Sequence, residues 1–113
     1  MELKSVTFEL SAAEPEKAAA WYAELLETEV VRPGAGLFEV KMAGAYLVLS
    51  DAKGASDIQG SVNLEVDDAE RARNDLVDRG YACSELQSFE GMMAMFSLAD
   101  PDGRNLTFMQ VGG

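Results

Sequence analysis

Residues 5–10 read SVTFEL, and residues 61–66 read SVNLEV. The two stretches have the same residue at their first, second and fifth positions, and an apolar residue at their fourth. In both, apolar and polar residues alternate, which is the two-residue period of a β-strand with one buried face. A match of this length is weak by itself, so the sequence that follows each stretch decides whether the chain contains a repeat.

The first stretch is followed by the pattern of a helix and further strands. Pro15 stands at the first position of a helix predicted over 15–27, where proline is favoured, and apolar residues recur there at helical spacing. An Arg-Pro-Gly sequence predicts a turn at 32–34. The strands expected in this half cover 3–10, 37–42 and 45–50, and a polar, glycine-containing linker follows over 51–60.

The second stretch is followed by the same order of elements. Asp67 or Asp68 can cap a second helix, and Gly80 can close it. Strands are then expected near 81–86, 93–98 and 105–111. The chain is therefore predicted to be one domain, residues 1–113, made of two tandem βαβββ modules, 3–52 and 59–111. Its expected fold class is α+β, with two sheets and a helix covering one face of each.

The composition disfavours several classes of function. The 113 residues include 20 acidic and 9 basic side chains, and the net charge of −11 disfavours nucleic acids and anionic membranes as partners. No stretch approaches about 18 consecutive apolar residues, and no secretory signal is visible, so we expect a cytoplasmic protein. Histidine is absent, which removes the commonest metal ligand and general base. The one cysteine, Cys83, is interpreted as a small buried residue rather than a reactive thiol.

Three features together resemble one family. They are the duplicated module, the pair Trp21-Tyr22 ahead of Leu25-Leu26, and the ending ADPDGRNLTFMQ over 99–110. This combination resembles the vicinal oxygen chelate superfamily, which includes glyoxalase I, extradiol dioxygenases and bleomycin-resistance proteins. Arg104 departs from the asparagine that the family usually has in this turn. The resemblance implies that the two sheets curl and together form a cup whose concave face binds the ligand.

The resemblance also implies where a metal would bind. Enzymatic members are expected to hold a divalent metal through a histidine at the start of each module's first strand and a glutamate in a module's last strand. Carried over to this chain, those positions are Ser5, Ser61, Thr107 and Val48. Neutral hydroxyls are weak donors to zinc, and valine cannot ligate. We therefore expect no metal and no cofactor.

The polar faces of the two first strands are the predicted lining of the cup, and both retain a glutamate. The methionine-rich segment 88–96 suits a wall for a flat ligand, because thioethers are adaptable and polarizable. The pattern leaves open which side of 93–98 would line the cup, and it places Phe89 in a loop overhanging it. The predicted ligand-binding residues are Ser5, Thr7, Glu9, Tyr46, Val48, Ser61, Asn63, Glu65, Phe89, Met93, Met95 and Thr107.

The predicted function is non-catalytic binding of a cationic or neutral aromatic compound, such as an antibiotic, in the manner of bleomycin-resistance proteins. Apolar walls would bury the ligand, and Glu9 and Glu65 would complement its positive charge. One alternative is a metal-independent isomerase or lyase that uses these two glutamates as acid and base. A magnesium or calcium site at the two carboxylates, and a module that serves only protein association, are further alternatives. The resemblance also predicts a homodimer with two sites related by twofold symmetry.

Overall fold

The computed structural model describes residues 1–34, 37–51, 61–90 and 92–112. The chain divides into two compact units, Met1–Gln59 and Gly60–Gly113. No helix in the described part of the chain is long and apolar enough to cross a membrane.

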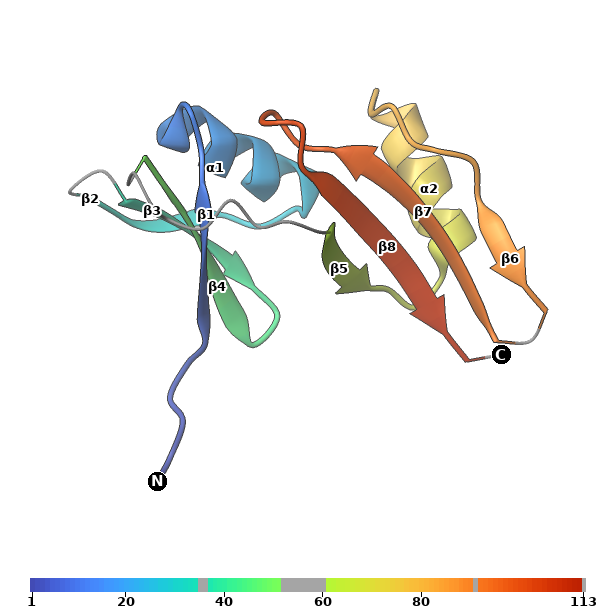
Figure 1. Cartoon of the computed structure of the whole chain (residues 1–113), viewed down its shortest axis with the longest axis horizontal. Helices are drawn as coiled ribbons and strands as arrows, with labels where there is room; N and C mark the ends of the chain where they lie inside the picture. The colour runs from blue at the N-terminus through green and yellow to red at the C-terminus, as the bar shows by residue number, and fades with distance from the viewer. Residues whose placement is uncertain (35–36, 52–60, 91, 113) are drawn as a thin grey trace. The chain divides into compact units, whose positions relative to one another are not determined.

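Unit 1 contains one helix and a four-stranded sheet (Figure 1). The sheet has the order β1-β4-β3-β2, in which β1 runs parallel to β4 and the other neighbours are antiparallel. The elements in chain order are β1 (Thr7–Ser11), α1 (Pro15–Leu25), β2 (Val30–Gly34), β3 (Leu37–Met42) and β4 (Ala45–Ser50).

Unit 2 repeats this arrangement. Its sheet has the order β5-β8-β7-β6, again with the first strand parallel to the last and the other pairs antiparallel. The predicted α+β fold of two βαβββ modules is confirmed. The elements are β5 (Ser61–Glu65), α2 (Ala69–Asp78), β6 (Gln87–Phe89), β7 (Met93–Ala99) and β8 (Asn105–Val111).

Two predicted elements are wrong. Residues 32–34 belong to β2 rather than to a turn, because β2 is an edge strand whose register shifts between Val31 and Gly34, and such an edge tolerates a proline. Residues 81–86 do not form a strand, and the strand of this region is β6. The Tyr81 amide donates to the carbonyl of Leu76 in the preceding helix, so the start of this segment serves as a helix end.

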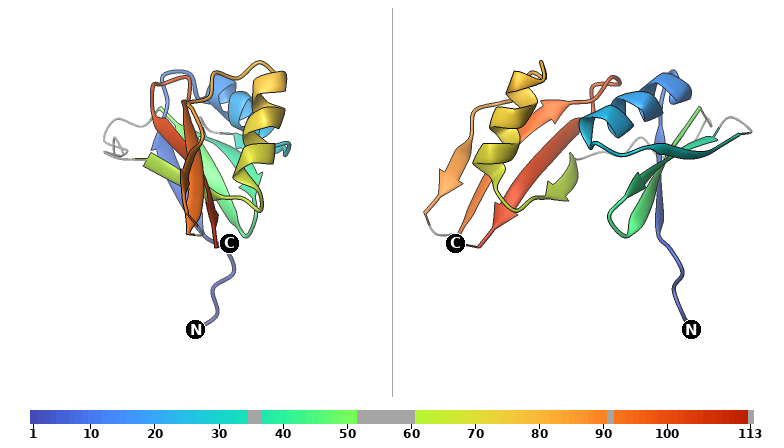
Figure 2. Two further views of the ribbon diagram at one scale, coloured as in Figure 1. Left: turned by 90° about the vertical axis from the view of Figure 1, so that its right-hand side faces the viewer. Right: turned by 180° about the vertical axis from the view of Figure 1, so that it is seen from behind.

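Each helix covers one face of its own sheet, and Figure 2 shows this for α2. The side chains of unit 1 that face α1 are apolar and buried, and they include Leu10, Val40, Leu47 and Leu49. The first strand departs from the prediction, because Val6 and Phe8 remain 41% and 54% exposed. The helix packs chiefly on β3 and β4, which leaves the edge strand β1 largely uncovered.

The core of unit 2 contains a pair of stacked rings. Phe96 and Phe108 lie opposite each other on β7 and β8, with ring centroids 5.0 Å apart and planes within 3°. Leu98 and Leu106 are buried on the same face, against α2. This apolar layer fixes which faces of β7 and β8 point away from the helix.

The two helices end in the same way but begin differently. Each C-terminus is followed by a residue at positive φ, Gly80 at 96° and Glu27 at 53°, and the next amide donates back to the helix, as in a Schellman motif. The helix α1 begins at Pro15 without a side-chain cap. For α2, Asp68 accepts from the Arg71 amide at 3.0 Å, and Gln110 Oε1 accepts from the Ala69 amide at 2.9 Å.

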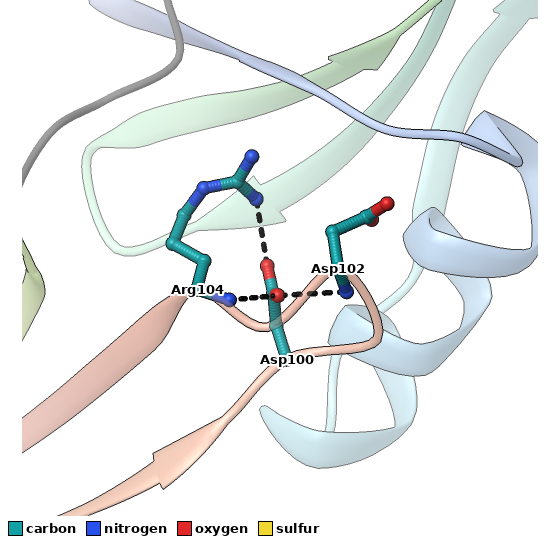
Figure 3. Close-up of polar contacts among 3 residues, drawn as sticks. All are labelled: Asp100, Asp102 and Arg104. Atoms are coloured by element: carbon teal, nitrogen blue, oxygen red, sulfur yellow. Dashed lines mark hydrogen bonds and ion pairs between the residues drawn. The ribbon is translucent and has the colours of Figure 1, made fainter.

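A buried ion pair holds the turn that precedes β8 (Figure 3). Asp100 Oδ1 accepts hydrogen bonds from the amides of Asp102 and Arg104, and Asp100 Oδ2 accepts from Arg104 Nη1 at 2.6 Å. The Asp100 side chain is fully buried and that of Arg104 is 9% exposed. The arginine that departs from the family's usual asparagine is therefore the ionic partner of the carboxylate that organises the turn.

Candidate functional site

The candidate site is the face of each sheet that points away from its helix, which we call the open face. Side chains alternate between the two faces of a strand, and residues paired across neighbouring strands share a face. In unit 1 the buried residues Leu47 and Leu49 face α1, so the alternate residues of β4 lie on the open face. The open face of unit 1 carries Thr7, Glu9, Ser11, Glu39, Lys41, Tyr46, Val48 and Ser50.

An acidic row crosses the open face of unit 1. Glu9 and Glu39 are the two cross-strand partners of Val48, one on either side. With neighbouring strands about 4.8 Å apart, the two glutamate backbones are separated by roughly two strand spacings. Val48 is buried and Glu9 is exposed, so a carboxylate stands beside an apolar floor.

A buried serine holds one of these carboxylates. Ser50 Oγ donates a hydrogen bond to Glu9 Oε2 at 2.6 Å. Ser50 is 1% exposed, and its carbonyl accepts from the Ala12 amide at 2.8 Å, which ties the end of β4 to the residue after β1. The Glu9 side chain is therefore fixed from the strand next to its own.

The open face of unit 2 is apolar where that of unit 1 is acidic. The residue opposite Glu65 is Met109, and the residue opposite Met109 on β7 is Met95. Both thioether side chains are half-buried. The open face of unit 2 carries Asn63, Glu65, Gln87, Phe89, Met93, Met95, Ser97, Thr107, Met109 and Val111.

The register brings most predicted site residues together within each unit. Thr7, Glu9, Tyr46 and Val48 share the open face of unit 1. The predicted residues on the open face of unit 2 are Asn63, Glu65, Phe89, Met93, Met95 and Thr107. Ser5 is exposed and precedes β1, and Ser61 is the first residue of β5.

The register shows which side chains of strand 93–98 lie on the open face of unit 2. Met93 and Met95 lie on the open face with Glu65, while Phe96 and Leu98 face the helix. Phe89 is not in a loop, because it belongs to β6 and pairs with Met93. Its side chain therefore lies on the same face as Met93, Met95 and Met109, which we call the methionine surface, rather than overhanging that face.

Several open-face residues were not predicted as site residues, and two of them, Glu39 and Met109, lie in the same rows as the predicted glutamates. Glu39 and Met109 lie on predicted strands, and simple alternation places each on the polar or exposed side. What alternation does not supply is their partners, which make Glu39 the counterpart of Glu9 across Val48 and Met109 the neighbour of Glu65.

The donor set does not fit a divalent metal. The register corrects one step of the carry-over, because Thr107 lies opposite Asn63 and the corresponding residue opposite Thr7 is Tyr46 rather than Val48. Neither a threonine nor a tyrosine replaces a carboxylate ligand at neutral pH. Among the described residues, no group of three acidic, histidine or cysteine side chains could hold a metal ion.

Two other features lie apart from the open faces. A cleft of about 300 Å³ at the start of α1 is lined by Glu14, Phe38 and Asp51, and Lys17 pairs with Glu14 there at 3.0 Å. Phe38 is on the helix side of the sheet, so this cleft is separate from the acidic row. Burial raises the pKa of the half-buried Cys83 thiol, an effect that Arg73 partly opposes, and this agrees with a structural cysteine.

The family of the chain is shown by a match over nearly its whole length. The model of the glyoxalase-like domain matches residues 5–109. The chain belongs to this family, and thus to the vicinal oxygen chelate superfamily that its sequence resembles. A search of curated protein sequences gave no match.

Several solved structures share the fold. The antibiotic-binding protein TnmS3 from a Streptomyces species is 26% identical, with a TM-score of 0.75 and 99% of each chain covered. A lactoylglutathione lyase from Agrobacterium tumefaciens is 17% identical, with a TM-score of 0.77, 97% of this chain and 95% of that chain covered. A glyoxalase/bleomycin resistance protein/dioxygenase from Nocardioides is 16% identical, with a TM-score of 0.76 and coverage of 98% and 85%. The last two establish the fold alone.

Proposed function

We propose that the protein binds a small organic molecule, cationic or neutral and aromatic, without using a metal. The observation that carries this proposal is the open face of unit 2, where Met93, Met95 and Met109 lie together beside Glu65. Thioether side chains adapt to a flat ring and make favourable contacts with its edge. The similarity to an antibiotic-binding protein supports the same class of ligand.

The charge of the open faces favours a cation over an anion. Glu9, Glu39 and Glu65 lie on these faces, and the whole chain has a net charge of −11. At an effective dielectric near 20, an anion about 4 Å from one carboxylate meets a repulsion of roughly 4 kcal/mol. A cation gains from the same geometry, so electrostatics adds to the apolar contacts.

We also propose that the protein acts as a homodimer in the cytoplasm. Each module presents one small four-stranded sheet, and enclosing an aromatic ligand takes more surface than one such face offers. Twofold symmetry would give each dimer two equivalent sites. Sedimentation at micromolar concentration should give twice the mass of one chain, and a monomer would remove this part of the proposal.

A thermal-shift screen tests the ligand class. We expect cationic and neutral aromatic compounds to raise the melting temperature and anionic ones to leave it unchanged. High salt should weaken the cationic hits, because it screens exposed charges. Glu9→Gln and Glu65→Gln should weaken the same hits, whereas Glu16→Gln removes an exposed carboxylate from α1 and should not.

Two outcomes of this screen would overturn the proposal. Hits confined to anions would contradict the charge argument. A cationic hit that both glutamate variants bind as tightly as the native protein does would contradict the role of these carboxylates. Turnover of a hit that either variant abolishes would instead establish the enzymatic alternative.

A further inference from the structure

We propose that Ser50 is a positioning residue that makes Glu9 contribute more than Glu65 to recognition of the ligand's charge. This inference rests on the proposed function and adds to it the carboxylate that discriminates cationic from neutral ligands, which lies on the open face of unit 1.

The hydroxyl of Ser50 contacts the carboxylate of Glu9. The hydrogen bond from Ser50 Oγ to Glu9 Oε2 is 2.6 Å long and has an ionised acceptor, which places it among the stronger hydrogen bonds of proteins. Because Ser50 is 1% exposed, its hydroxyl is shielded from competing water. An exposed glutamate otherwise samples several rotamers, and this bond restricts Glu9 to those that reach the neighbouring strand.

Unit 2 has no serine at the position that corresponds to Ser50. Ser50 lies two residues beyond Val48, the partner of Glu9, and the residue two beyond Met109, the partner of Glu65, is Val111. Valine has no hydrogen-bond donor in its side chain. The two glutamates occupy matching positions of the repeat, but the serine that bonds Glu9 has a valine at its matching position in unit 2.

Ordering of the Glu9 side chain before binding favours pairing with a cationic ligand. A side chain that is already ordered loses less entropy when a ligand pairs with it, and ordering one flexible side chain on binding weakens affinity by roughly two- to tenfold. The oxygen of Glu9 that Ser50 does not bind directly, Oε1, remains on an exposed residue and can meet a cationic group. Glu9 should therefore contribute more to charge discrimination than Glu65.

The experiment measures discrimination rather than affinity alone. Fluorescence titrations would use proflavine, a planar cation, and acridine, the neutral ring without its amino groups. The quantity compared is the ratio of the two dissociation constants. We expect Glu9→Gln to remove most of the preference for proflavine, and Ser50→Ala to lower it by about fivefold, the equivalent of one side chain left to be ordered on binding.

Two variants separate positioning from simple structural support. Ser50→Thr keeps the hydroxyl and should retain the preference. Ser88→Ala removes an exposed serine of β6 that pairs with Ala94 and lies off the open face, and it should leave the preference unchanged. In the Glu9→Gln background, Ser50→Ala should have no further effect, because the carboxylate that it orients is gone.

A readout without any ligand tests the same claim. Side-chain couplings measured by NMR should show one dominant rotamer of Glu9 in the native protein and averaging in Ser50→Ala. Averaging already present in the native protein, or an unchanged preference in Ser50→Ala, would overturn the inference while leaving the proposed function intact. A preference unchanged in Glu9→Gln would also overturn the inference, and a preference unchanged in both Glu9→Gln and Glu65→Gln would overturn the charge argument of the proposed function as well.

Discussion

The two units share one topology but differ in the chemistry of their open faces. Unit 1 has Glu9, Val48 and Glu39 in one row across three strands, and the matching row of unit 2 is Glu65, Met109 and Met95. The helix-facing positions do not diverge in this way. Val40 corresponds to Phe96 and Leu47 to Phe108, and all four are buried.

This difference separates what the fold requires from what a ligand requires. A helix must bury an apolar stripe against its sheet, so most residues facing it are apolar in both copies. The exception is Gln110, which corresponds to Leu49 and accepts a hydrogen bond from the first turn of α2. The open face has no such constraint from its own unit. One copy has two carboxylates around an apolar floor, and the other has one carboxylate and a thioether at the matching positions. The comparison can be tested by altering one unit at a time.

The largest expected effect comes from the turn that unit 1 lacks. Its two strands β3 and β4 are joined by a two-residue turn with Gly44 at a φ of 76°, whereas β7 and β8 are joined through the Asp100–Arg104 pair. Removing Asp100 takes a buried ionic partner from Arg104 and the acceptor from two backbone amides of the turn, and breaking such a buried pair costs about 3–5 kcal/mol. Asp100→Ala should lower the free energy of unfolding by this amount, as measured by urea denaturation.

The control for this variant is an exposed aspartate of the same unit. Asp67→Ala should change the free energy of unfolding by less than about 0.5 kcal/mol, as is usual for surface positions. A loss below about 1 kcal/mol in Asp100→Ala would show that the pair does not organise the turn.

An intermediate effect should follow from giving unit 2 the acidic row of unit 1. Met95 corresponds to Glu39, so Met95→Glu places a second carboxylate beside Met109. A thioether contact with a ring is worth about 0.3–1.5 kcal/mol, and the new carboxylate must also lose water beneath a neutral ring. Acridine should bind about tenfold more weakly, and proflavine should lose less because its charge is complemented.

Met92→Glu is the matched control, because it introduces the same charge at an exposed residue that precedes β7. It should leave the affinity for acridine unchanged. Equal weakening by the two variants would mean that bulk charge, and not the methionine surface, determines binding of the neutral ring.

The smallest effect concerns the helix ends. Both C-termini need a residue at positive φ, and unit 2 has Gly80 there while unit 1 has Glu27. A side chain in this conformation costs about 1 kcal/mol relative to glycine. Glu27→Gly should therefore raise the melting temperature slightly, and Gly80→Ala should lower it although the space around Gly80 is open. A lower melting temperature in Glu27→Gly, or a higher one in Gly80→Ala, measured by calorimetry, would contradict this account of the caps.

Much of the fold could be predicted because its signals are local. Pro15 marks the start of α1, Asp68 the start of α2, and the strands over 37–42 and 45–50 have the predicted bounds. The errors arose where tertiary context overrides a local signal. Pro33 indicates a turn by composition but lies in an edge strand. Phe8 alternates like a core residue, yet α1 does not reach far enough to bury it.

The candidate site was only partly predictable for a similar reason. Alternation along a strand indicates which residues share a face, and this placed Met93 with Met95 correctly. The register between strands depends on pairing across the sheet, which no single strand encodes. The row formed by Glu9 and Glu39 and the bond from Ser50 therefore emerged only from the structure.

The most direct test of the central proposal is a calorimetric titration of proflavine into the protein in two states. One sample is treated with a chelator and dialysed, and the other is supplemented with zinc. If binding is metal-independent, the two dissociation constants should be equal, and both should increase with salt as exposed charges are screened. Binding that appears only in the zinc-supplemented sample, or in neither sample, would contradict the proposal.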